Sequence, residues 1–319
     1  MGSLVNIVTT EEESWCLAPE KKIKQIEKEV DFSVNVISVK QGDVKTLRKK
    51  LKEVYKKSLF PKFLNFIIET KDSSLIDVVN EFTTIHTGES KETIELDDNK
   101  AKLKEFLRDK VIATPEGFDC NKKADVKQFK YPCFIKPADF EDSIGIDETS
   151  VCRTPEEAQK VLDKFEIYNT ILVEEYLTGE EYTVTVVHKG HNQYKVYPAR
   201  MDMKPNKRGD KILGYEEKQG DDCKLVADFS EEKAKEICDL AFNTFNAIGA
   251  KNYARIDIRD DENGIAKVLE VNLYAGLGKD GYMADCYRAN GLEYFDMLND
   301  VISSAIHTKG GKYVRTYTR

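Results

Sequence analysis

The sequence predicts a protein of the α/β and α+β classes, built from more than one packed unit. Its 319 residues are too many for one ordinary hydrophobic core, so two or three units are expected. Strand and helix patterns alternate over residues 1–92, which favours a layer with a parallel sheet. Residues 253–278 instead predict a β-hairpin, because turn residues at 260–264 separate two runs of alternating polarity.

The composition excludes several classes of function. With 40% hydrophobic and 33% charged residues, it is typical of a soluble globular protein, and the net charge of −8 argues against nucleic acid as the main partner. No apolar run approaches the roughly 18 residues of a membrane span, and no signal-peptide pattern is present. The seven cysteines are scattered, odd in number and without a CxxC pair. We therefore expect a cytoplasmic protein with reduced thiols, without a disulfide framework, a zinc site or a membrane.

The first 92 residues carry the alternating pattern. Short apolar runs predict strands, and the lysine-rich stretches between them predict helices. The lysines are interpreted as a solvated face in preference to a patch that binds a partner. Strands are expected over residues 4–8, 34–39 and 63–68, and helices over residues 19–30 and 44–57.

A different pattern begins after residue 94. A helix is expected with Asp97 or Asp98 as its N-terminal cap and Lys100 in its first turn. The strand predicted at residues 131–137 then places Lys136 near its end. Further strands are expected over residues 146–151, 171–177 and 181–188, and further helices over residues 155–165, 230–248 and 282–306.

Residues 198–222 form a long segment without a regular pattern. The segment contains several basic residues and three glycines. Irregular segments of this length in a compact domain are usually lids over a site or disordered loops. Both interpretations remain open at this point.

The hairpin at 253–278 concentrates polar side chains on one face. Because side chains two apart share a face of a strand, Arg255 and Asp257 point to the same side on the first arm. Glu270 and Asn272 do so on the second arm. Such oxygen ligands suit Mg²⁺, which combines one or two carboxylates with water and substrate phosphates. Arg255 could then stabilise developing negative charge beside the metal. The alternative is a solvated face whose charges serve solubility.

Five segments in order resemble the ATP-grasp ligases, and among them the D-alanine–D-alanine ligase family. They are FIKPADFEDSIGI, ILVEEYLTGEEYTVTVV, GYEEKQ, YARIDIRDDENGIAKVLEVNLYAGLG and the helix that follows. The resemblance covers about residues 83–307. It implies an ATP-grasp fold, in which two α+β subdomains clasp ATP, preceded by a small parallel α/β domain. The implied boundaries are residues 1–94 for the N-terminal domain, 95–186 for the central subdomain and 187–319 for the C-terminal subdomain, with a lid at about 198–222.

The resemblance implies an ATP-dependent ligase that joins a carboxylate to an amine. In the family, the carboxylate takes the γ-phosphate of ATP, and the amine then attacks the acyl phosphate, which releases ADP and phosphate. The implied partners are small molecules, namely a carboxylate and an amine that are both expected to be amino acids, and a homodimer is expected because family members are commonly dimers. The implied cofactors are ATP and Mg²⁺, with up to two ions and Mn²⁺ as a substitute. The alternative is an ATP-binding homologue without ligase activity that acts as a regulator or scaffold.

The resemblance also assigns residues to the nucleotide. Lys136 resembles the family lysine that meets the α- and β-phosphates, and Lys100 the lysine of the preceding helix. Glu181 resembles the carboxylate that holds the ribose hydroxyls. Two further nucleotide-binding residues that it implies are Ser143 of the phosphate-covering loop and Lys218 of the lid. The others form the connection that reads adenine through its backbone and leaves its side chains relatively free, namely Glu174, Glu175, Tyr176 and Leu177.

The catalytic and metal residues follow from the same resemblance. Arg255 matches the arginine that stabilises the tetrahedral oxyanion, and Gly276 matches the glycine of the turn after the hairpin. Lys218 matches the lid lysine that closes over the γ-phosphate. The implied magnesium ligands are Asp257, Glu270 and Asn272.

The chain departs from the family pattern mainly at the amino-acid end of the site. Where the family has a serine that holds the second D-alanine, this chain has Gly281, and Ala275 replaces the proline of the preceding turn. Gln219 replaces a lid tyrosine, and Glu141 and Asp142 occupy a loop in which the family has a glycine and serines. The N-terminal glycine pair and glutamate of the family have only poor stand-ins, namely Thr9, Thr10 and Glu12 or Glu13. We therefore expect substrates other than two D-alanines. A close alternative keeps D-alanyl-D-alanine as the product, with the binding contacts supplied by other residues.

Overall fold

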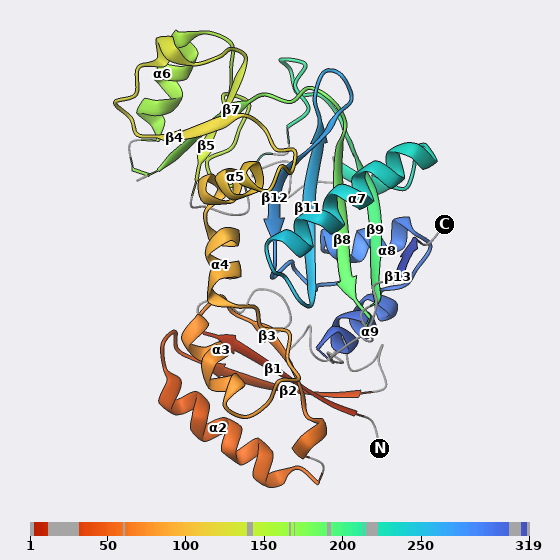
Figure 1. The fold of residues 1–319 in the computed structure, drawn as a ribbon. Coiled ribbons are helices and arrows are strands. Elements are labelled where there is room, and N and C mark those ends of the chain that lie inside the picture. Colours follow the sequence, from red (N-terminus) through yellow and green to blue (C-terminus); the bar gives the residue numbers. More distant parts are fainter. Residues whose placement is uncertain are drawn as a thin grey trace.

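Three β-sheets organise the chain (Figure 1). The computed structural model describes residues 3–11, 32–59, 61–138, 143–165, 167–168, 170–189, 193–212, 214, 223–305 and 314–317. A parallel sheet lies at the N-terminus, and two antiparallel sheets follow it. This arrangement confirms the predicted fold class.

The N-terminal sheet has three parallel strands in the order β2-β1-β3. Helix α2 follows β2 and is capped by Asp43, whose side chain accepts a hydrogen bond from the Thr46 N–H. The helix buries Leu47 and Leu51 and leaves its lysines outside, as predicted. The predicted helix at 19–30 lies outside the described residues. The elements are β1 (Ser3–Thr10), β2 (Phe32–Val39), α2 (Val44–Lys57), the 3₁₀ turn η1 (Pro61–Phe63), β3 (Asn65–Glu69) and α3 (Ser73–Asn80).

Two short helices connect the N-terminal sheet to the rest of the chain. They are α4 (Lys91–Asp98) and α5 (Lys100–Asp109). The predicted cap of the second helix was wrong, because Asp97 and Asp98 are the last two residues of α4 and the side chain of Asn99 caps α5. Lys100 is therefore the first residue of α5, and its position in the first turn is confirmed.

The second sheet has four antiparallel strands in the order β4-β7-β5-β6. Helix α6 begins at Pro155 after the cap Thr154, as predicted. The strand expected over residues 146–151 was wrong, since only Val151 and Cys152 pair with β5. The elements are β4 (Gly117–Cys120), the 3₁₀ turn η2 (Val126–Gln128), β5 (Cys133–Pro137), β6 (Val151–Cys152), α6 (Pro155–Lys164) and β7 (Ile171–Glu175).

The third sheet runs in the order β10-β9-β8-β11-β12, and β13 pairs with β9. The segment predicted as irregular from residue 198 is still strand β9 as far as Met203, so the described irregular part begins at Lys204. The strands are β8 (Glu181–His188), β9 (Gln193–Met203), β10 (Cys223–Val226), β11 (Tyr253–Asp260), β12 (Ala266–Asn272) and β13 (Val314–Tyr317).

Helices cover both faces of the third sheet. Helix α7 (Glu231–Ala247) crosses one face, while α8 (Tyr282–Ala289) and α9 (Tyr294–Ser304) lie against the other (Figure 1). The single helix predicted over residues 282–306 was wrong. The chain turns at Asn290 and Gly291, and Gly291 adopts a φ of 74°, which glycine tolerates without strain.

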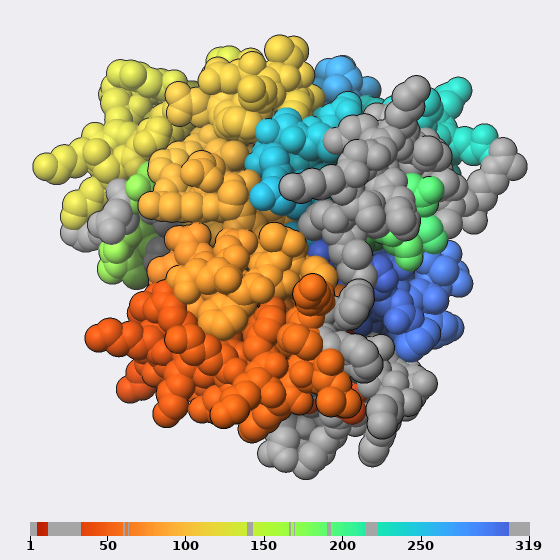
Figure 2. Space-filling view, turned by 60° about the horizontal axis from the view of Figure 1, so that its bottom comes forward, coloured from red at the N-terminus to blue at the C-terminus, as the bar shows by residue number. Residues whose placement is uncertain are grey.

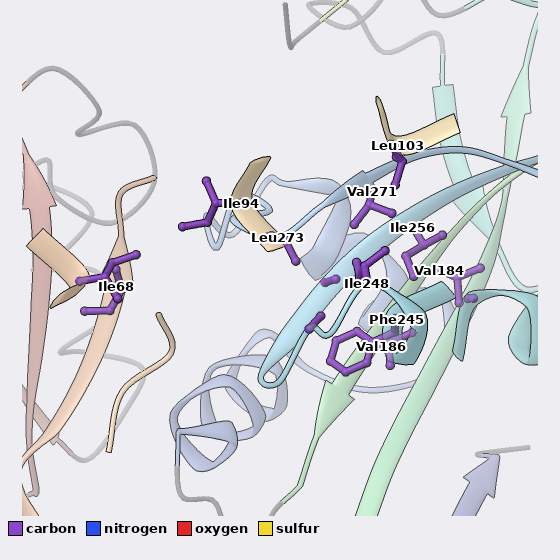
Figure 3. Close-up of a cluster of buried hydrophobic side chains, with 14 of the residues drawn as sticks. Ile68, Ile94, Leu103, Val184, Val186, Phe245, Ile248, Ile256, Val271 and Leu273 are labelled. Carbon is purple, nitrogen blue, oxygen red and sulfur yellow. The ribbon is translucent and has the colours of Figure 1, made fainter. Parts of the chain in front are cut away.

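One hydrophobic cluster joins the N-terminal sheet to the third sheet (Figure 3). Ile68 and Ile94 lie at one end, and Ile256 on β11 packs towards Phe245 on α7 at the other. Burying a side chain of this size contributes roughly 1.5–3 kcal/mol. Because Ile256 and its neighbours two residues apart occupy this face, the alternate side chains of β11 must point to the opposite face.

The units also meet through polar contacts. The Asn65 side chain at the start of β3 donates a 2.7 Å hydrogen bond to the Ile302 carbonyl in α9. The space-filling view shows the orange N-terminal residues in a continuous surface with later parts of the chain (Figure 2). Within the ranges given above, no helix has the length and apolar character needed to cross a membrane.

Candidate functional site

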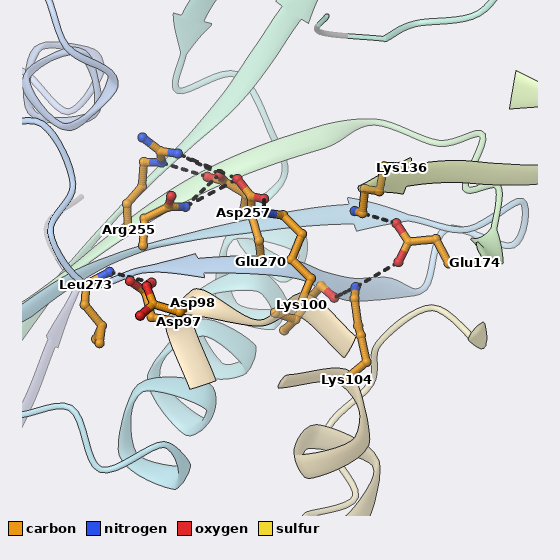
Figure 4. Close-up of polar contacts among 12 residues, drawn as sticks. Asp97, Asp98, Lys100, Lys104, Lys136, Glu174, Arg255, Asp257, Glu270 and Leu273 are labelled. Carbon is orange, nitrogen blue, oxygen red and sulfur yellow. Dashed lines mark hydrogen bonds and ion pairs between the residues drawn. The ribbon is translucent and has the colours of Figure 1, made fainter. Parts of the chain in front are cut away.

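The polar face of the β11–β12 hairpin forms the first half of the site (Figure 4). Arg255 lies opposite Asn272 in the antiparallel register, and Asp257 lies opposite Glu270. Period-two alternation therefore brings these four side chains together, as the sequence predicted. The Arg255 Nε and Nη2 atoms donate to the two Asp257 oxygens at 3.0 and 2.9 Å.

Arg255 is a buried and permanently charged group. Burial by itself would lower the pKa of its guanidinium, but the Asp257 carboxylate outweighs burial and raises that pKa above its ordinary value. Its guanidinium carbon lies 5.5 Å from the centre of the Tyr282 ring. Thr183 on β8 also fixes the pair, since its hydroxyl donates to Asp257 at 2.8 Å. A fixed cation at this point can stabilise an oxyanion with little reorganisation.

The donors beside Arg255 fit magnesium by their chemistry. The Asn272 amide lies 3.3 Å from Asp257 and 3.5 Å from Glu270, so two carboxylates and one amide converge. Turning that amide about its own bond would present its oxygen instead of its nitrogen. In the part of the chain that the structure describes, no three His, Cys, Asp or Glu side chains form a metal site. An ion here would therefore also need water and phosphate oxygens, which is the usual situation of Mg²⁺.

A buried triad forms the second half of the site. Glu174 on β7 lies between two lysines, with the Lys136 Nζ 2.6 Å from one oxygen and the Lys104 Nζ 3.3 Å from the other (Figure 4). The three side chains are 7% exposed or less. Burial would raise the pKa of Glu174, but the two lysines outweigh it and lower that pKa. The prediction that the Glu174 side chain is relatively free was wrong.

The two lysines of the triad differ in their electrostatics. Burial lowers the pKa of Lys104 to about 8, although Glu174 opposes this shift. For Lys136, burial also acts to lower the pKa, but the closer Glu174 reverses the effect and raises it. Sequence reasoning missed Lys104. Its spacing of four from Lys100 on one helix places both on the same face, and that signal could have identified it.

Lys100 connects the two halves of the site. Its Nζ lies 3.7 Å from a Glu270 oxygen, at the hairpin, while its helix also supplies Lys104 to the triad. Three lysines, one arginine and three carboxylates thus lie along one row (Figure 4). Such a row can hold a polyanion together with a divalent cation.

Both halves line a single open cleft between the second and third sheets. The cleft contains about 800 Å³ of empty space that continues into solvent. Its wall includes the predicted connection from Glu174 to Leu177, and it includes Ser143 and Glu181. All the predicted nucleotide residues that the structure describes, except Lys100, line this cleft, and Lys100 contacts Glu270 of its wall. The apolar part of the lining comprises Phe134, Ile146, Met201, Ile212 and Leu269.

A family comparison decides the identity of the chain. Residues 99–303 match the family model described as D-ala D-ala ligase C-terminus, which is more than half of the sequence. The chain belongs to the D-alanine–D-alanine ligase family. It is an ATP-grasp ligase, and the resemblance stated from its motifs is confirmed.

Curated relatives of this ligase are distant in sequence. The D-alanine–D-alanine ligase of Thermotoga petrophila is 23% identical over 305 residues, which cover 95% of this chain and 96% of that protein. The enzyme of the same name from Bacillus velezensis is 28% identical over 221 residues. That match covers 69% of this chain but only 60% of the Bacillus protein, so the matched part spans about three fifths of it.

Solved structures share the fold of this ligase over almost its full length. D-alanine–D-alanine ligase from Bacillus anthracis, complexed with ATP, superposes with a TM-score of 0.66 at 14% identity and covers 95% of this chain and 97% of its own. The VanG D-Ala:D-Ser ligase from Enterococcus faecalis superposes with a TM-score of 0.69 at 17% identity. That match covers 96% of this chain and 100% of the VanG chain. An L-amino acid ligase from Bacillus licheniformis superposes with a TM-score of 0.65 at 14% identity, and the match covers 95% of this chain and 74% of that one.

The turn that follows the hairpin contains one departure of this ligase from its family. Gly281 is the N-terminal cap residue of α8. A Cβ atom at this position would lie 3.0 Å from the Gly276 carbonyl oxygen and 3.2 Å from that of Gly278. The turn is thus too tight for a serine at 281 without a shift of backbone. Lys218 and Gln219, like Glu12, Glu13, Glu141 and Asp142, lie outside the described residues.

Proposed function

We propose that this chain is a carboxylate–amine ligase that forms an amide through an acyl phosphate and releases ADP and phosphate. The observation that carries the proposal is the row of paired cations and carboxylates along one cleft, from Lys136 and Glu174 through Lys100 and Glu270 to Asp257 and Arg255. Phosphoryl transfer needs little covalent help from a protein, and it depends mainly on positioning and on cations around the phosphates.

The lysines of the triad would hold the nucleotide phosphates. Lys136 and Lys104 are buried, and Glu174 balances their charge before a nucleotide arrives. A triphosphate that enters the cleft offers both lysines further anionic partners at the same depth. Lys100, on the same helix face as Lys104, would contact the phosphate nearest to Glu270. Lys218 would add a cation over the γ-phosphate.

The hairpin would hold Mg²⁺ and the reacting carbonyl. Asp257, Glu270 and Asn272 would bind the ion, with up to two ions present and Mn²⁺ able to replace Mg²⁺. A bound ion would neutralise the negative charge that builds on the phosphates during transfer. Asp257 would have to share its oxygens between this ion and Arg255, which keeps the arginine next to the metal.

Arg255 would act in the second step. The amine nitrogen attacks the carbonyl carbon of the acyl phosphate, and a tetrahedral oxyanion forms. The carbon–oxygen bond to phosphate then breaks, phosphate leaves, and the nitrogen loses a proton to give the amide. The buried guanidinium of Arg255 and the backbone N–H groups near Gly276 would stabilise the oxyanion.

The connection between the two antiparallel sheets would bind the nucleoside. The Glu175 N–H already donates to the Glu116 carbonyl at 2.8 Å, and the Glu175 side chain pairs with Lys267. We therefore expect the adenine edge to be read by the backbone of Tyr176 and Leu177. Glu181 and Ser143 would contact the ribose and the phosphates, respectively.

The substrates proposed are amino acids, with an acceptor other than D-alanine. The comparisons support amino-acid substrates in general, since the related structures include a D-Ala:D-Ser ligase and an L-amino acid ligase. The turn at Gly281 supports a changed acceptor site, because Gly281 has no side chain to hold an acceptor carboxylate and a Cβ there would crowd two backbone carbonyls.

Phosphate release from Mg-ATP tests the proposal directly. A panel of D- and L-amino acids and small acids is offered singly and in pairs, and the products are identified by mass spectrometry. We expect release to require a carboxylate and an amine together. Measurable ATP binding without release for any pair would favour a regulator that has lost ligation.

A further inference from the structure

Arg259 continues the polar face of β11 beyond the residues assigned above. It lies two residues after Asp257 and directly opposite Glu181 of β8 in the antiparallel register. Its Nη1 donates to a Glu181 carboxylate oxygen at 3.1 Å, and its Nε donates to the Gly179 carbonyl at 3.2 Å. The Arg259 and Glu181 side chains are 8% and 13% exposed, and both line the cleft.

A second set of contacts holds the guanidinium from its other side. The Arg259 guanidinium carbon lies 5.7 Å from the centre of the Tyr176 ring. That ring stacks on Phe134 at 6.5 Å with an interplanar angle of 15°, and its hydroxyl donates to the buried Asp210 at 3.0 Å. Arg153 in turn donates to the same Asp210 oxygen at 2.6 Å. The plane of Arg259 is therefore fixed by a carboxylate, a carbonyl and a ring.

We propose that Arg259 is a positioning residue that sets the preference of this ligase for a ribonucleotide. It acts through Glu181. A carboxylate distinguishes a ribose from a deoxyribose only if its oxygen is held where the hydroxyl donates. The charge-assisted bond from Arg259 to Glu181 provides that hold, and the second bond of Arg259, to the Gly179 carbonyl, fixes the arginine itself. This inference rests on the proposed ATP site and extends it to a residue of the hairpin to which the family resemblance assigns no role.

Nucleotide binding to the full chain tests the inference without any amino-acid substrate. The dissociation constants of Mg-ATP, Mg-2′-deoxy-ATP and Mg-3′-deoxy-ATP are compared by calorimetry for the wild type and for Arg259→Gln. We expect the wild type to prefer ATP about tenfold over the weaker deoxy analogue, the value of one hydrogen bond to a charged group. In Arg259→Gln, ATP binding should weaken about tenfold, the analogue should bind almost as before, and the preference should fall below about twofold.

The matched control is Arg200→Gln. Arg200 is a part-buried arginine on β9 that pairs with Glu180, the neighbour of Glu181, and it does not line the cleft. We expect it to keep the tenfold preference, because the same type of ion pair is lost without effect on Glu181. A general loss of folded protein in either variant would instead weaken the binding of all three nucleotides equally.

Two further variants keep the test decisive. Arg259→Lys replaces Arg259→Gln in the test if the latter fails to fold. The lysine keeps the charge but cannot contact Gly179 and Glu181 together, so we expect a preference for ATP between those of the wild type and Arg259→Gln. Glu181→Gln should remove the preference, with no additional loss in the double variant. The inference is overturned if Arg259→Gln keeps the wild-type preference, if it binds ATP more tightly, or if the wild type does not discriminate. Failure of the ligase assay alone leaves these ratios measurable, whereas a chain that binds no ATP refutes both proposals.

Discussion

The triad around Glu174 gives the most quantitative prediction. Glu174→Gln keeps the shape of the side chain and removes its charge, which leaves two ammonium groups without the carboxylate that lies 2.6 and 3.3 Å from them. All three side chains are almost fully buried. Removing one partner from a buried ion pair costs about 3–5 kcal/mol, because the remaining charge has lost its compensation. We expect the free energy of unfolding to fall by about this amount.

The neighbouring residue provides a matched control. Glu175→Gln removes a carboxylate that pairs with Lys267 at 2.8 Å but is 30% exposed. Since water screens this pair, its loss should cost about 1 kcal/mol or less. Urea unfolding followed by circular dichroism measures both variants, and equal losses for the two would refute the electrostatic account of the triad.

ATP binding should restore part of the stability that Glu174→Gln loses. If the nucleotide phosphates contact Lys104 and Lys136, they replace the missing carboxylate as the anion between the two lysines. Saturating Mg-ATP should therefore shift the urea midpoint of Glu174→Gln by more than it shifts that of Glu175→Gln. Equal shifts would mean that the phosphates do not reach these lysines.

Three further predictions concern the same cleft. Arg255→Ala should leave ATP binding nearly intact and lower turnover at least 100-fold, the usual loss for one oxyanion donor, and unchanged turnover would disprove the role of Arg255. Asp257→Asn should raise the Mg²⁺ concentration required for half-maximal activity, and an unaltered metal titration would contradict its assignment as a ligand. ATP should bind more weakly as the pH rises above about 8, by up to tenfold per pH unit, because Lys104 loses its proton there and the phosphates favour the protonated form. Lys104→Met should remove this pH dependence of the dissociation constant.

The alternation of polar and apolar residues was sufficient to predict the hairpin. Strand side chains alternate with a period of two, so the sequence alone placed Arg255, Asp257, Glu270 and Asn272 on one face. The structure places the four together in register, with Ile256 on the buried face. Their chemical roles remain predictions, because a geometry without substrates does not test them.

The triad could not be predicted in the same way. Lys104 and Glu174 belong to a helix and a strand that are distant in sequence, and only the packing of α5 against the second and third sheets brings them together. The sequence motif contains Glu174 and Glu175 side by side, and it does not tell which carboxylate is buried. Arg259 was missed because its partner Glu181 lies on a different strand, 78 residues away in the sequence.

The boundaries of helices were predicted wrongly where the local sequence allowed two interpretations. Asp97, Asp98 and Asn99 can all cap a helix, and the structure uses Asn99. Asn290 and Gly291 interrupt a helical pattern that continues on both sides, so the sequence suggested one helix where there are two. In both cases, tertiary packing decided between local alternatives that differ little in energy.

Oxygen transfer tests the central claim most directly. The amino acid that gives the greatest phosphate release is labelled with ¹⁸O in its carboxylate and incubated with Mg-ATP and the acceptor amine. If an acyl phosphate forms, the oxygen between carbon and phosphorus comes from the substrate, and each released phosphate carries one ¹⁸O atom. Phosphate without label would mean that water attacks ATP, and the assignment of this cleft to acyl-phosphate ligation would then be wrong.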